Sequence, residues 1–525
     1  MRTVAAVAAL LALAGSAIAG TLKIPVHKQG PGSAVSKHPL LTKRASAIEE
    51  LVNNITGGGY YASVSVGTPG QSINLVLDTG SSDAFVVDVN ADLCTSRRLQ
   101  VEYGMTCDAT FDSSDSSTFS VVQQNGFSIE YLDGSTASGD FVSDSFEIAD
   151  VTLDDFQFGL ADSTVTGTGV LGIGFVAEEV ALTTYPNLPQ ALVDAGAISV
   201  NAYSLYLNEY DSDTGSILFG GVDTEKFIGE LTVLPILQDA RGRNYSSFTI
   251  GLAELAAVFS NGTDPANITL PSVLPAILDS GTTLSYLPDD VATPLFEAVN
   301  AYTYTEGSQG LTLIDCKYLD SDEELTMNFG FASSLTSSSS EVTISVRAAE
   351  LVLDVYQGYQ SQMPSEIPFD EVCLFGLQSS GVALPSGQAQ SIEFALLGDT
   401  FLRSAYVVYH LENRQIGLAQ ANLGSSDSDV QELSASGTSL PVFTGVASQA
   451  SNPTATTTRS SGGSGNGGGS SSTSQSGMVI ITVTASPTAS NNAAVASTRP
   501  PTGEAFAVMA VVGIFTLFGG LLFAL

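Results

Sequence analysis

The central part of the chain, residues 45–421, alternates between short apolar runs and turn-forming residues. Runs rich in β-branched and aromatic residues are broken about every 8–12 residues by Gly, Asp, Asn or Pro, which is typical of an all-β protein. The clearest strands are expected at residues 60–66, 73–77, 127–131, 204–207 and 406–411. Helical spacing of apolar residues is rare, and the best candidates are residues 188–195 and 291–302. The pattern predicts an all-β fold with few short helices.

The first 44 residues carry two processing signals. A short apolar run ends in the small-x-small sequence Ala17-Ile18-Ala19, which predicts a secretory signal peptide over residues 1–19. The basic residues 20–44 follow and end in Lys43-Arg44, a dibasic cleavage site. We therefore expect residues 20–44 to be a pro-segment and the mature chain to begin at Ala45.

The C-terminal part of the chain has the composition of a stalk followed by an attachment signal. Residues 422–492 are dominated by Ser, Thr, Gly and Ala, which predicts a flexible, O-glycosylated stalk. Residues 505–525 are uncharged, so a transmembrane helix is one interpretation. Small residues around Asn492, a polar spacer and no basic residue after the apolar run favour a GPI-attachment signal over residues 493–525, with Asn492 as the attached residue.

Charge and histidine content exclude several classes of function. The chain of 525 residues has 54 acidic and 17 basic side chains, a net charge of −37, so it would repel nucleic acid. Cleavage after Arg44 would remove six basic residues and no acidic ones, leaving a net charge of −43 and one histidine, His410. One histidine excludes a zinc site built on several imidazoles. A nucleophile–histidine triad would depend entirely on His410, which we expect in an apolar strand. We expect no metal and no cofactor.

The cysteines and sequons fit a secreted protein. An even number of cysteines behind a signal peptide predicts disulfides rather than a thiol nucleophile. Three connectivities are open, and pairing neighbours in sequence is the local choice. Asn-x-Ser/Thr sequons predict glycosylated surface loops. The residues concerned are Cys94, Cys107, Cys316 and Cys373, and Asn54, Asn244, Asn261 and Asn267.

The candidate chemistry lies in a short phrase that occurs twice. An apolar strand leads into Asp78-Thr79-Gly80 and, 201 residues later, another leads into Asp279-Ser280-Gly281. In each copy a glycine permits a sharp loop and leaves one carboxylate at its tip. One copy would be an ordinary turn. Two copies behind apolar strands indicate two similar lobes that face one another, an N-terminal β-lobe over residues 45–223 and a C-terminal β-lobe over residues 224–421.

These residues resemble the pepsin-like aspartic endopeptidases, and the resemblance covers residues 60–421. Residues 131–135 resemble the tip of that family's flap, and residues 170–174 and 396–403 resemble the segments behind its two catalytic loops. The dibasic site, stalk and apolar terminus resemble the yapsin-like, GPI-anchored group of fungi. The resemblance implies a bilobal fold with the active-site cleft between the lobes. It also favours the disulfides Cys94–Cys107 and Cys316–Cys373, because the family has a small loop in lobe one and a larger loop in lobe two.

The resemblance implies a role for each residue of the two loops and the flap. Asp78 and Asp279 correspond to a dyad that shares one proton and activates a water molecule. Thr79 and Ser280 correspond to residues that hold the loops together, and Ser81 and Thr282 to hydroxyl groups that bond to the carboxylates. The remaining family positions are Gly80 and Gly281 in the loops and Tyr131, Gly134 and Ser135 in the flap.

Two residues depart from the common pattern of the family. Phe85 stands where a tryptophan usually braces the flap tyrosine, so the ring is kept but the N–H donor is lost. Asp133 lies in the flap, where an acidic residue occurs in relatives that accept Lys or Arg before the scissile bond. The alternative is that Asp133 is only a turn residue of Asp-Gly type.

Together these patterns predict a secreted, monomeric aspartic endopeptidase on the extracellular face of the plasma membrane, held by a GPI anchor, or in the cell wall. It would hydrolyse polypeptides at acidic pH and favour basic residues before the scissile bond. A catalytically silent pepsin-fold binding protein and a structural wall glycoprotein are the alternatives. Silent relatives usually lose one aspartate or the flap tyrosine, whereas this chain keeps Asp78, Asp279 and Tyr131.

Overall fold

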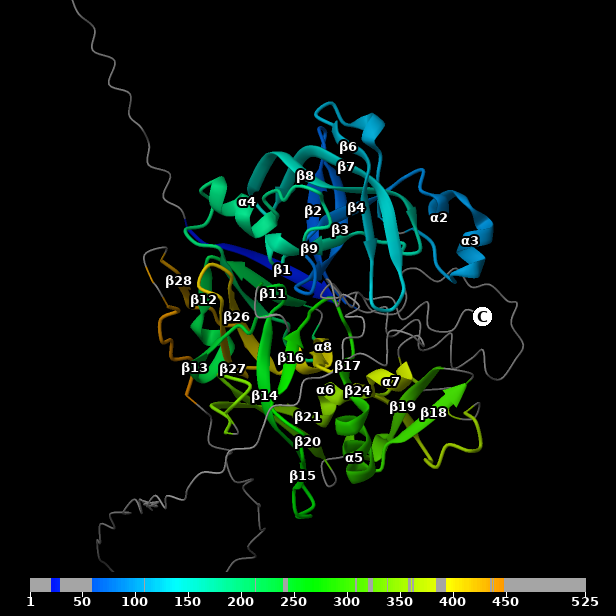
Figure 1. Ribbon diagram of the computed structural model, residues 1–525, viewed down its shortest axis with the longest axis vertical. Helices are drawn as coiled ribbons and strands as arrows, with labels where there is room; N and C mark the ends of the chain where they lie inside the picture. The colour runs from blue at the N-terminus through cyan, green and yellow to red at the C-terminus, as the bar shows by residue number, and fades with distance from the viewer. Residues whose placement is uncertain are drawn as a thin grey trace, which may run out of the picture. The chain divides into compact units, whose positions relative to one another are not determined.

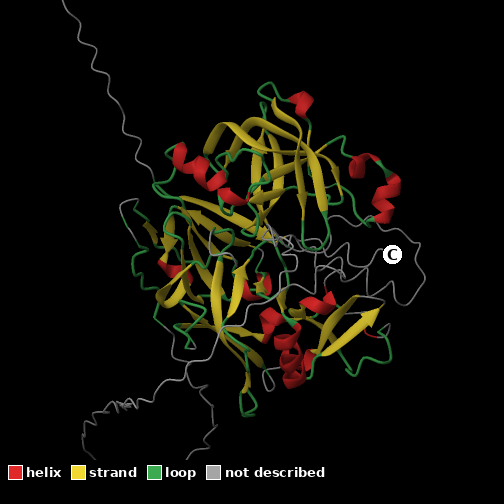
Figure 2. Ribbon diagram, viewed as in Figure 1, coloured by secondary structure: helices red, strands yellow, loops and turns green. Residues whose placement is uncertain are grey.

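The computed structural model describes residues 20–28 and 59–447, with gaps at 108, 213, 239–243, 307–308, 320–323, 338, 357–359, 361–362, 384–392, 435–436 and 438. Strands dominate these residues and the helices are short (Figure 2). The all-β class expected from the alternating pattern is confirmed. The predicted signal peptide, Lys43-Arg44, Asn54, Asn492 and the apolar residues 505–525 lie outside the described residues.

The largest sheet runs through both halves of the sequence (Figure 1). Its spatial order is β13 (Phe227–Pro235), β27 (Gln415–Ala421), β26 (Ala405–His410), β10 (Ala202–Tyr206), β11 (Thr214–Phe219), β1 (Leu22–Lys28), β2 (Tyr60–Val66), β3 (Gln71–Asp78), β9 (Val170–Gly172), β4 (Ala84–Asp88), β8 (Val151–Thr164), β7 (Thr136–Ile148) and β6 (Ser120–Glu130), with β5 (Thr110–Phe111) beside β4. The predicted lobe boundary at residues 223–224 falls between β12 (Gly221–Asp223), which belongs to a separate two-stranded sheet, and β13 of the largest sheet.

The second half of the chain builds two further sheets. One contains β21 (Val342–Arg347), β20 (Leu325–Ala332), β14 (Thr249–Phe259), β16 (Leu274–Leu278), β25 (Ala395–Leu397), β17 (Ser285–Leu287) and β24 (Leu377–Ser379), with β15 (Ala266–Ile268) beside β14. The other contains β18 (Tyr302–Glu306), β19 (Gln309–Asp315), β23 (Val372–Phe375) and β22 (Val352–Leu353). The α-helices are α2 (Asp92–Thr95), α3 (Arg97–Glu102), α4 (Leu188–Asp194), α5 (Asp289–Val299), α6 (Ala348–Leu351), α7 (Ser380–Ala383) and α8 (Asp399–Leu402).

The two lobes repeat one local arrangement of strands. In the first, β3 runs parallel to β9, and in the second β16 runs parallel to β25. The strand that follows each loop, β4 or β17, pairs antiparallel with the same neighbour. Each Asp-Thr/Ser-Gly phrase thus follows the equivalent strand of its lobe, as the duplicated sequence predicts.

The expected elements all occur, and their ends differ by at most three residues from those expected, except that β6 begins earlier, at Ser120. The strands expected from the sequence occur as β2, β3, β6, β10 and β26, and the first helix as α4. The second helix was expected to reach residue 302, but α5 ends at Val299. Asn300 adopts the left-handed conformation there, with φ 53°, and this stops the helix.

Ordered structure continues beyond residue 421, where the sequence pattern placed the start of the stalk. β28 (Val430–Glu432) pairs with β12 (Gly221–Asp223), and Leu433 and Leu440 are buried in an apolar cluster with Phe227 and Tyr406. The predicted start of the stalk at residue 422 was too early. The segment is dominated by Ser, Thr and Gly, and this composition gave no indication that two of its leucines are buried.

The part of the predicted pro-segment that the structure describes is a strand. β1 lies between β2 and β11 and buries Leu22, Ile24 and Val26 on one face (Figure 1). The alternation of buried and exposed side chains is that of a strand with one face on the core.

Among the described residues, no helix is long and apolar enough to cross a membrane.

Candidate active site

The two repeated loops are joined to each other by four hydrogen bonds. Thr79 Oγ1 accepts from Ser280 N at 2.9 Å and donates to Leu278 O at 3.0 Å. Ser280 Oγ accepts from Thr79 N at 3.2 Å and donates to Leu77 O at 2.9 Å. All four bonds are buried, so the tips of the two loops have one fixed relative position.

The arrangement brings Asp78 and Asp279 together. Asp78 accepts from Gly80 N at 2.7 Å and from the Ser81 hydroxyl, and Asp279 accepts from Gly281 N at 2.8 Å and from Thr282 Oγ1 at 2.7 Å. The two carboxyl groups lie close enough that each changes the pKa of the other. The approach requires glycine at position 80, since a Cβ atom there would lie 2.6 Å from Asp279 Oδ1.

Burial and mutual repulsion control the protonation of this pair. Asp78 and Asp279 are 0% and 1% exposed. Burial raises the pKa of the Asp279 carboxyl well above its usual range, and the charge of Asp78 raises it further. Burial also raises the pKa of Asp78, although the Ser81 hydroxyl and the neighbouring Asp279 partly oppose this rise. Both shifts favour a pair that shares one proton.

Each loop is supported from behind by the strand of its repeat. Ile173 N donates to Asp78 O at 3.0 Å and Gly174 N to Ser81 O at 2.7 Å. In the second lobe Asp279 N donates to Leu397 O at 3.0 Å and Asp399 N to Thr282 O at 2.8 Å. Glycine lets each of these segments pack closely against the backbone that follows the catalytic loop. A Cβ on Gly172 would lie 2.6 Å from Asp83 O, and one on Gly398 would lie 2.3 Å from Leu284 O.

Tyr131, Asp133, Gly134 and Ser135 form the tight turn between β6 and β7. Gly134 N donates to Tyr131 O at 2.9 Å, Tyr131 N donates to Ser135 O at 2.8 Å, and Gly134 has φ 84°. Asp133 Oδ1 accepts from Ser135 N at 2.8 Å, which is the turn role that Asp-Gly sequences favour. Its second oxygen, Oδ2, is buried without a hydrogen-bond partner in the described part of the chain. Burial raises the pKa of Asp133 to about 6.

Phe85 is fully buried in β4, and its ring lies 5.4 Å from that of Phe127 on β6. Phe85 and Tyr131 belong to the same apolar cluster, but the ring carries no donor for the tyrosine hydroxyl. The Tyr131 hydroxyl is buried and has no hydrogen-bond partner among the described residues. This is the consequence expected where phenylalanine replaces tryptophan.

One carboxylate beside the first loop was not singled out in the sequence. Asp83 follows the phrase directly and is 1% exposed. Its Oδ1 accepts from the Tyr185 hydroxyl at 2.8 Å and its Oδ2 from Val180 N at 2.9 Å. Burial raises the pKa of Asp83 to about 6. An acidic residue so close to a buried loop was the available signal, but nothing in the sequence identified Tyr185 as its partner.

A second buried group of charges lies behind the other loop. Arg403 and Glu350 form an ion pair, and Arg403 Nη2 also donates to Glu350 O at 2.6 Å. Lys28 of β1 donates to Tyr210 O at 2.7 Å, and its ammonium group lies 3.6 Å from the centre of the Tyr210 ring. Burial, and then the charge of Arg403, lowers the pKa of Lys28 to about 8. The strand from the predicted pro-segment thus packs against this ion pair.

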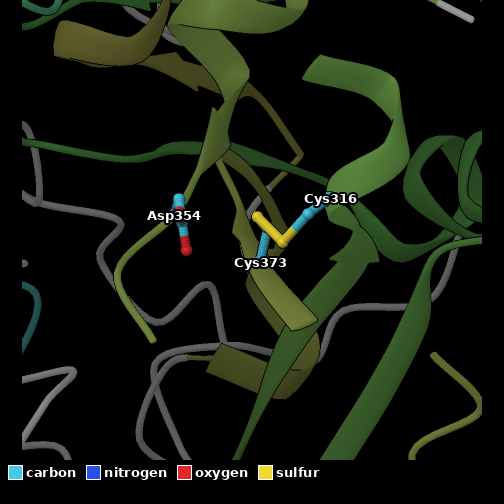
Figure 3. A group of neighbouring side chains, drawn as sticks. All are labelled: Cys316, Asp354 and Cys373. Carbon is cyan, nitrogen blue, oxygen red and sulfur yellow. A yellow bond between two sulfur atoms is a disulfide. The ribbon is translucent and has the colours of Figure 1, made fainter. Parts of the chain in front are cut away.

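The four cysteines pair with their neighbours in sequence, as expected. The disulfides are Cys94–Cys107 and Cys316–Cys373, each with a Cα–Cα distance of 5.2 Å. Asp354 is exposed beside the second disulfide, with its carboxylate within 4.8 Å of the sulfur atoms (Figure 3). Both sulfurs are used in the disulfide and are not thiolates, so this group lacks the ligands of a thiolate metal site.

The remaining predicted residues are a buried histidine and three exposed asparagines. His410 is 3% exposed in β26, where its Nδ1 accepts from Asn413 N at 3.2 Å. Burial lowers the pKa of His410, in keeping with a structural residue of the core. Asn244, Asn261 and Asn267 are exposed, as glycosylation would require.

The chain is similar to known proteins over most of its length. Residues 59–421 match the family described as eukaryotic aspartyl protease. The chain is 36% identical to a probable aspartic-type endopeptidase OPSB of Trichophyton verrucosum, over 79% of this chain and 80% of the relative. It is 33% identical to aspartic proteinase yapsin-3 of Saccharomyces cerevisiae, over 81% and 79%.

An aspartic proteinase from Irpex lacteus has the same fold, with a TM-score of 0.51 and 19% identity over 78% of this chain and 100% of that one. The bilobal pepsin-like fold and the likeness to a yapsin-like fungal group are thus confirmed. The chain belongs to the eukaryotic aspartyl protease family and is an aspartic-type endopeptidase.

Proposed function

We propose that Asp78 and Asp279 are the catalytic dyad of this endopeptidase. The observation that carries the proposal is the position of both buried carboxyl groups at the tips of two loops that four buried bonds hold together, with Asp279 so near Gly80 that a Cβ there would lie 2.6 Å from it. Like charges in contact cannot both ionise, so one carboxyl stays protonated and the other can act as a base.

The two carboxyl groups would have different tasks. Asp78, the more acidic member, takes a proton from water as the water oxygen attacks the scissile carbonyl carbon. Asp279 gives its proton to the carbonyl oxygen, so a neutral tetrahedral diol forms. As the diol collapses, one of its hydroxyls returns a proton to Asp279 and the C=O bond re-forms. The C–N bond breaks, and the nitrogen takes the proton held by Asp78 and leaves as the amine, so the dyad is restored. Because the pair must hold one proton, activity should be greatest at acidic pH.

Replacement of either aspartate tests the dyad. Asp78→Asn and Asp279→Asn keep the side-chain shape but remove the base or the acid. Each should lower kcat by at least about 10³-fold in a peptide-cleavage assay. Asp354→Asn, at an exposed aspartate of the second lobe, is the matched control and should leave kcat unchanged. Full turnover by Asp78→Asn would refute the mechanism, and a statine-type inhibitor should abolish wild-type activity.

We further propose that substrates are polypeptides and that Asp133 favours Lys or Arg before the scissile bond. Its Oδ1 is occupied by the turn, but Oδ2 is buried without a partner among the described residues, and a buried carboxylate oxygen favours a cation. Tyr131, Gly134 and Ser135 belong to the same turn and would close over the substrate as the flap. The preference should weaken below about pH 6, where Asp133 becomes protonated.

The matched variant for this preference is Asp133→Asn, because the asparagine oxygen can still accept from Ser135 N and keep the turn. Two peptides that differ only by Lys or norleucine before the scissile bond should be compared at pH 6.5. The ratio of their kcat/KM values should fall by about tenfold in the variant, as expected for the loss of one charge pair. An unchanged ratio would leave Asp133 as a turn residue.

The terminal signals support a proposal for processing and location. The protein would be secreted, cleaved after Arg44, glycosylated at Asn54, Asn244, Asn261 and Asn267, and held as a monomer at the outer face of the plasma membrane, or in the wall, through a GPI anchor at Asn492. N-terminal sequencing should find Ala45 first. A phosphatidylinositol-specific phospholipase should release the protein from cells, and resistance to it would favour a retained transmembrane helix.

A further inference from the structure

Tyr185 connects the first catalytic loop to the turn that carries Tyr131. Its hydroxyl donates to Asp83 Oδ1 at 2.8 Å, five residues after Asp78. Its ring packs edge-on against Phe141 of β7, with ring centres 5.8 Å apart and an angle of 67° between the planes. Tyr185 is 8% exposed, so both contacts are made in a largely dehydrated environment.

The contact with Phe141 is the start of a closed chain of rings. Phe141 packs against Phe127 of β6 at 5.6 Å, and Phe127 packs against Phe85 of β4 at 5.4 Å. Phe85 follows Asp83 by two residues, so the chain returns to the loop where it began. β6 and β7 are the two strands of the hairpin whose turn contains Tyr131, and Tyr131 lies in the same apolar cluster as all four rings.

The hairpin needs such a support, because the Tyr131 hydroxyl has no hydrogen-bond partner among the described residues. Phe85 packs against the hairpin but cannot donate to that hydroxyl. The hydrogen bond that links the catalytic loop to the aromatic cluster is therefore the one that Tyr185 donates to Asp83. Edge-on aromatic pairs have a preferred geometry, so they transmit the position of Tyr185 to the hairpin better than aliphatic contacts would.

We propose that Tyr185 and Asp83 are positioning residues for peptide hydrolysis, which hold the Tyr131 hairpin at a fixed distance from the catalytic loop. The proposal rests on the dyad and flap of the proposed function. Asp83 does not touch the paired carboxylates: both of its oxygens are used, one by Tyr185 and the other by Val180 N. It acts through the side chain that it orients.

The groups that face Asp83 define a conservative variant. Tyr185 and Glu179 are the titratable neighbours on the segment that packs against it, and Tyr131 is the neighbour on the hairpin. In Asp83→Asn, the amide oxygen can accept from Val180 N while the amide nitrogen donates to the Tyr185 oxygen. Both links are kept and the charge is lost. Asp83→Ala removes both links.

The hydroxyl itself is tested in the full-length protein by Tyr185→Phe, which keeps the ring and its packing. We expect kcat/KM for a peptide substrate to fall about tenfold, equivalent to about 1.4 kcal/mol of transition-state stabilisation. Tyr318→Phe is the matched control: Tyr318 is 5% exposed and its hydroxyl donates to Val299 O at 2.9 Å in the second lobe. The control should leave kcat/KM within twofold, although it also loses one buried hydrogen bond.

A double-variant comparison distinguishes positioning of the hairpin from a general loss of structure. In a Tyr131→Ala background, Tyr185→Phe should change kcat/KM by less than twofold, because there is no ring left to position. Asp83→Asn should keep most of the activity that Asp83→Ala loses. A tenfold effect that persists in the Tyr131→Ala background, or a Tyr185→Phe enzyme with wild-type kcat/KM, would overturn the proposal. Neither result would affect the dyad, which Asp78→Asn tests separately.

Discussion

The hydroxyls of Thr79 and Ser280 each accept a hydrogen bond from the backbone N–H of the other residue, and each donates to the carbonyl that precedes the other residue's aspartate. The two lobes are therefore joined symmetrically at the point where the carboxyl groups meet. Backbone hydrogen bonds from the segment behind each loop fix the rest of that loop.

Removal of one hydroxyl from this junction should destabilise the protein and separate the carboxyl groups. Thr79→Val has nearly the same shape but leaves Ser280 N and Leu278 O buried without their partner. Since a buried unsatisfied polar group costs about 1–3 kcal/mol, we expect a loss of about 2–4 kcal/mol in the free energy of unfolding. Denaturant unfolding measures this loss, and kcat should fall at least about tenfold at the same time.

The matched control for the junction is Thr343→Val, at an exposed position of β21, which should change the unfolding free energy by less than about 0.5 kcal/mol. If Thr79→Val were as stable and active as Thr343→Val, the four bonds would not hold the loops in place.

The carboxyl group of Glu179 should make stability depend on pH. Burial, and then the charge of Asp83, raises its pKa from 4.5 to about 8. The folded protein therefore keeps a proton that the unfolded chain releases above pH 4.5, and the free energy of unfolding falls as pH rises from about 4.5 to 8. Glu179→Gln removes this dependence while an amide oxygen still accepts from Tyr185 N, as Glu179 Oε2 does at 2.8 Å.

We expect Glu179→Gln to match the wild type at pH 4 and to be more stable by about 1–2 kcal/mol at pH 7, measured by denaturant unfolding at both values. Equal stability of the two proteins at pH 7 would mean that Glu179 ionises normally in the folded protein.

The sequence predicted the parts of the fold that rest on local pattern and repetition. The alternation of apolar residues predicted the strands. The two copies of one phrase predicted the duplicated lobes and identified Asp78 and Asp279 as candidate site residues. The Tyr185–Asp83 bond joins residues 102 positions apart, and no local pattern indicates such a partner. The packing of the described residues in 422–447 was missed for a related reason. Leu433 and Leu440 are apolar residues in a polar segment, and their burial depends on a cluster built from other parts of the chain.

The two disulfides should contribute unequally to stability. Cys94–Cys107 closes a loop with a sequence separation of 13, and Cys316–Cys373 one of 57. Because a longer loop loses more entropy when it is closed in the unfolded chain, the second disulfide should stabilise the protein by about 1 kcal/mol more than the first. Thermal unfolding of the Cys94→Ala/Cys107→Ala and Cys316→Ala/Cys373→Ala proteins compares them. A larger loss for the first pair would show that native packing, rather than loop entropy, decides the order.

The segment after residue 421 should be part of the folded enzyme rather than of the stalk. Leu440 is 3% exposed in the cluster that also holds Leu433, Phe227 and Tyr406, so Leu440→Ala should lower the free energy of unfolding by about 2–4 kcal/mol. Val442, two residues further, is 68% exposed, and Val442→Ala should have almost no effect. A chain that ends at residue 447 should unfold at the same denaturant concentration as one that keeps the stalk, whereas a chain that ends at residue 421 should unfold at a lower one. If the two shortened chains were equally stable, β28 and the two leucines would rest on the enzyme without stabilising it, and the stalk would begin where the composition first changes.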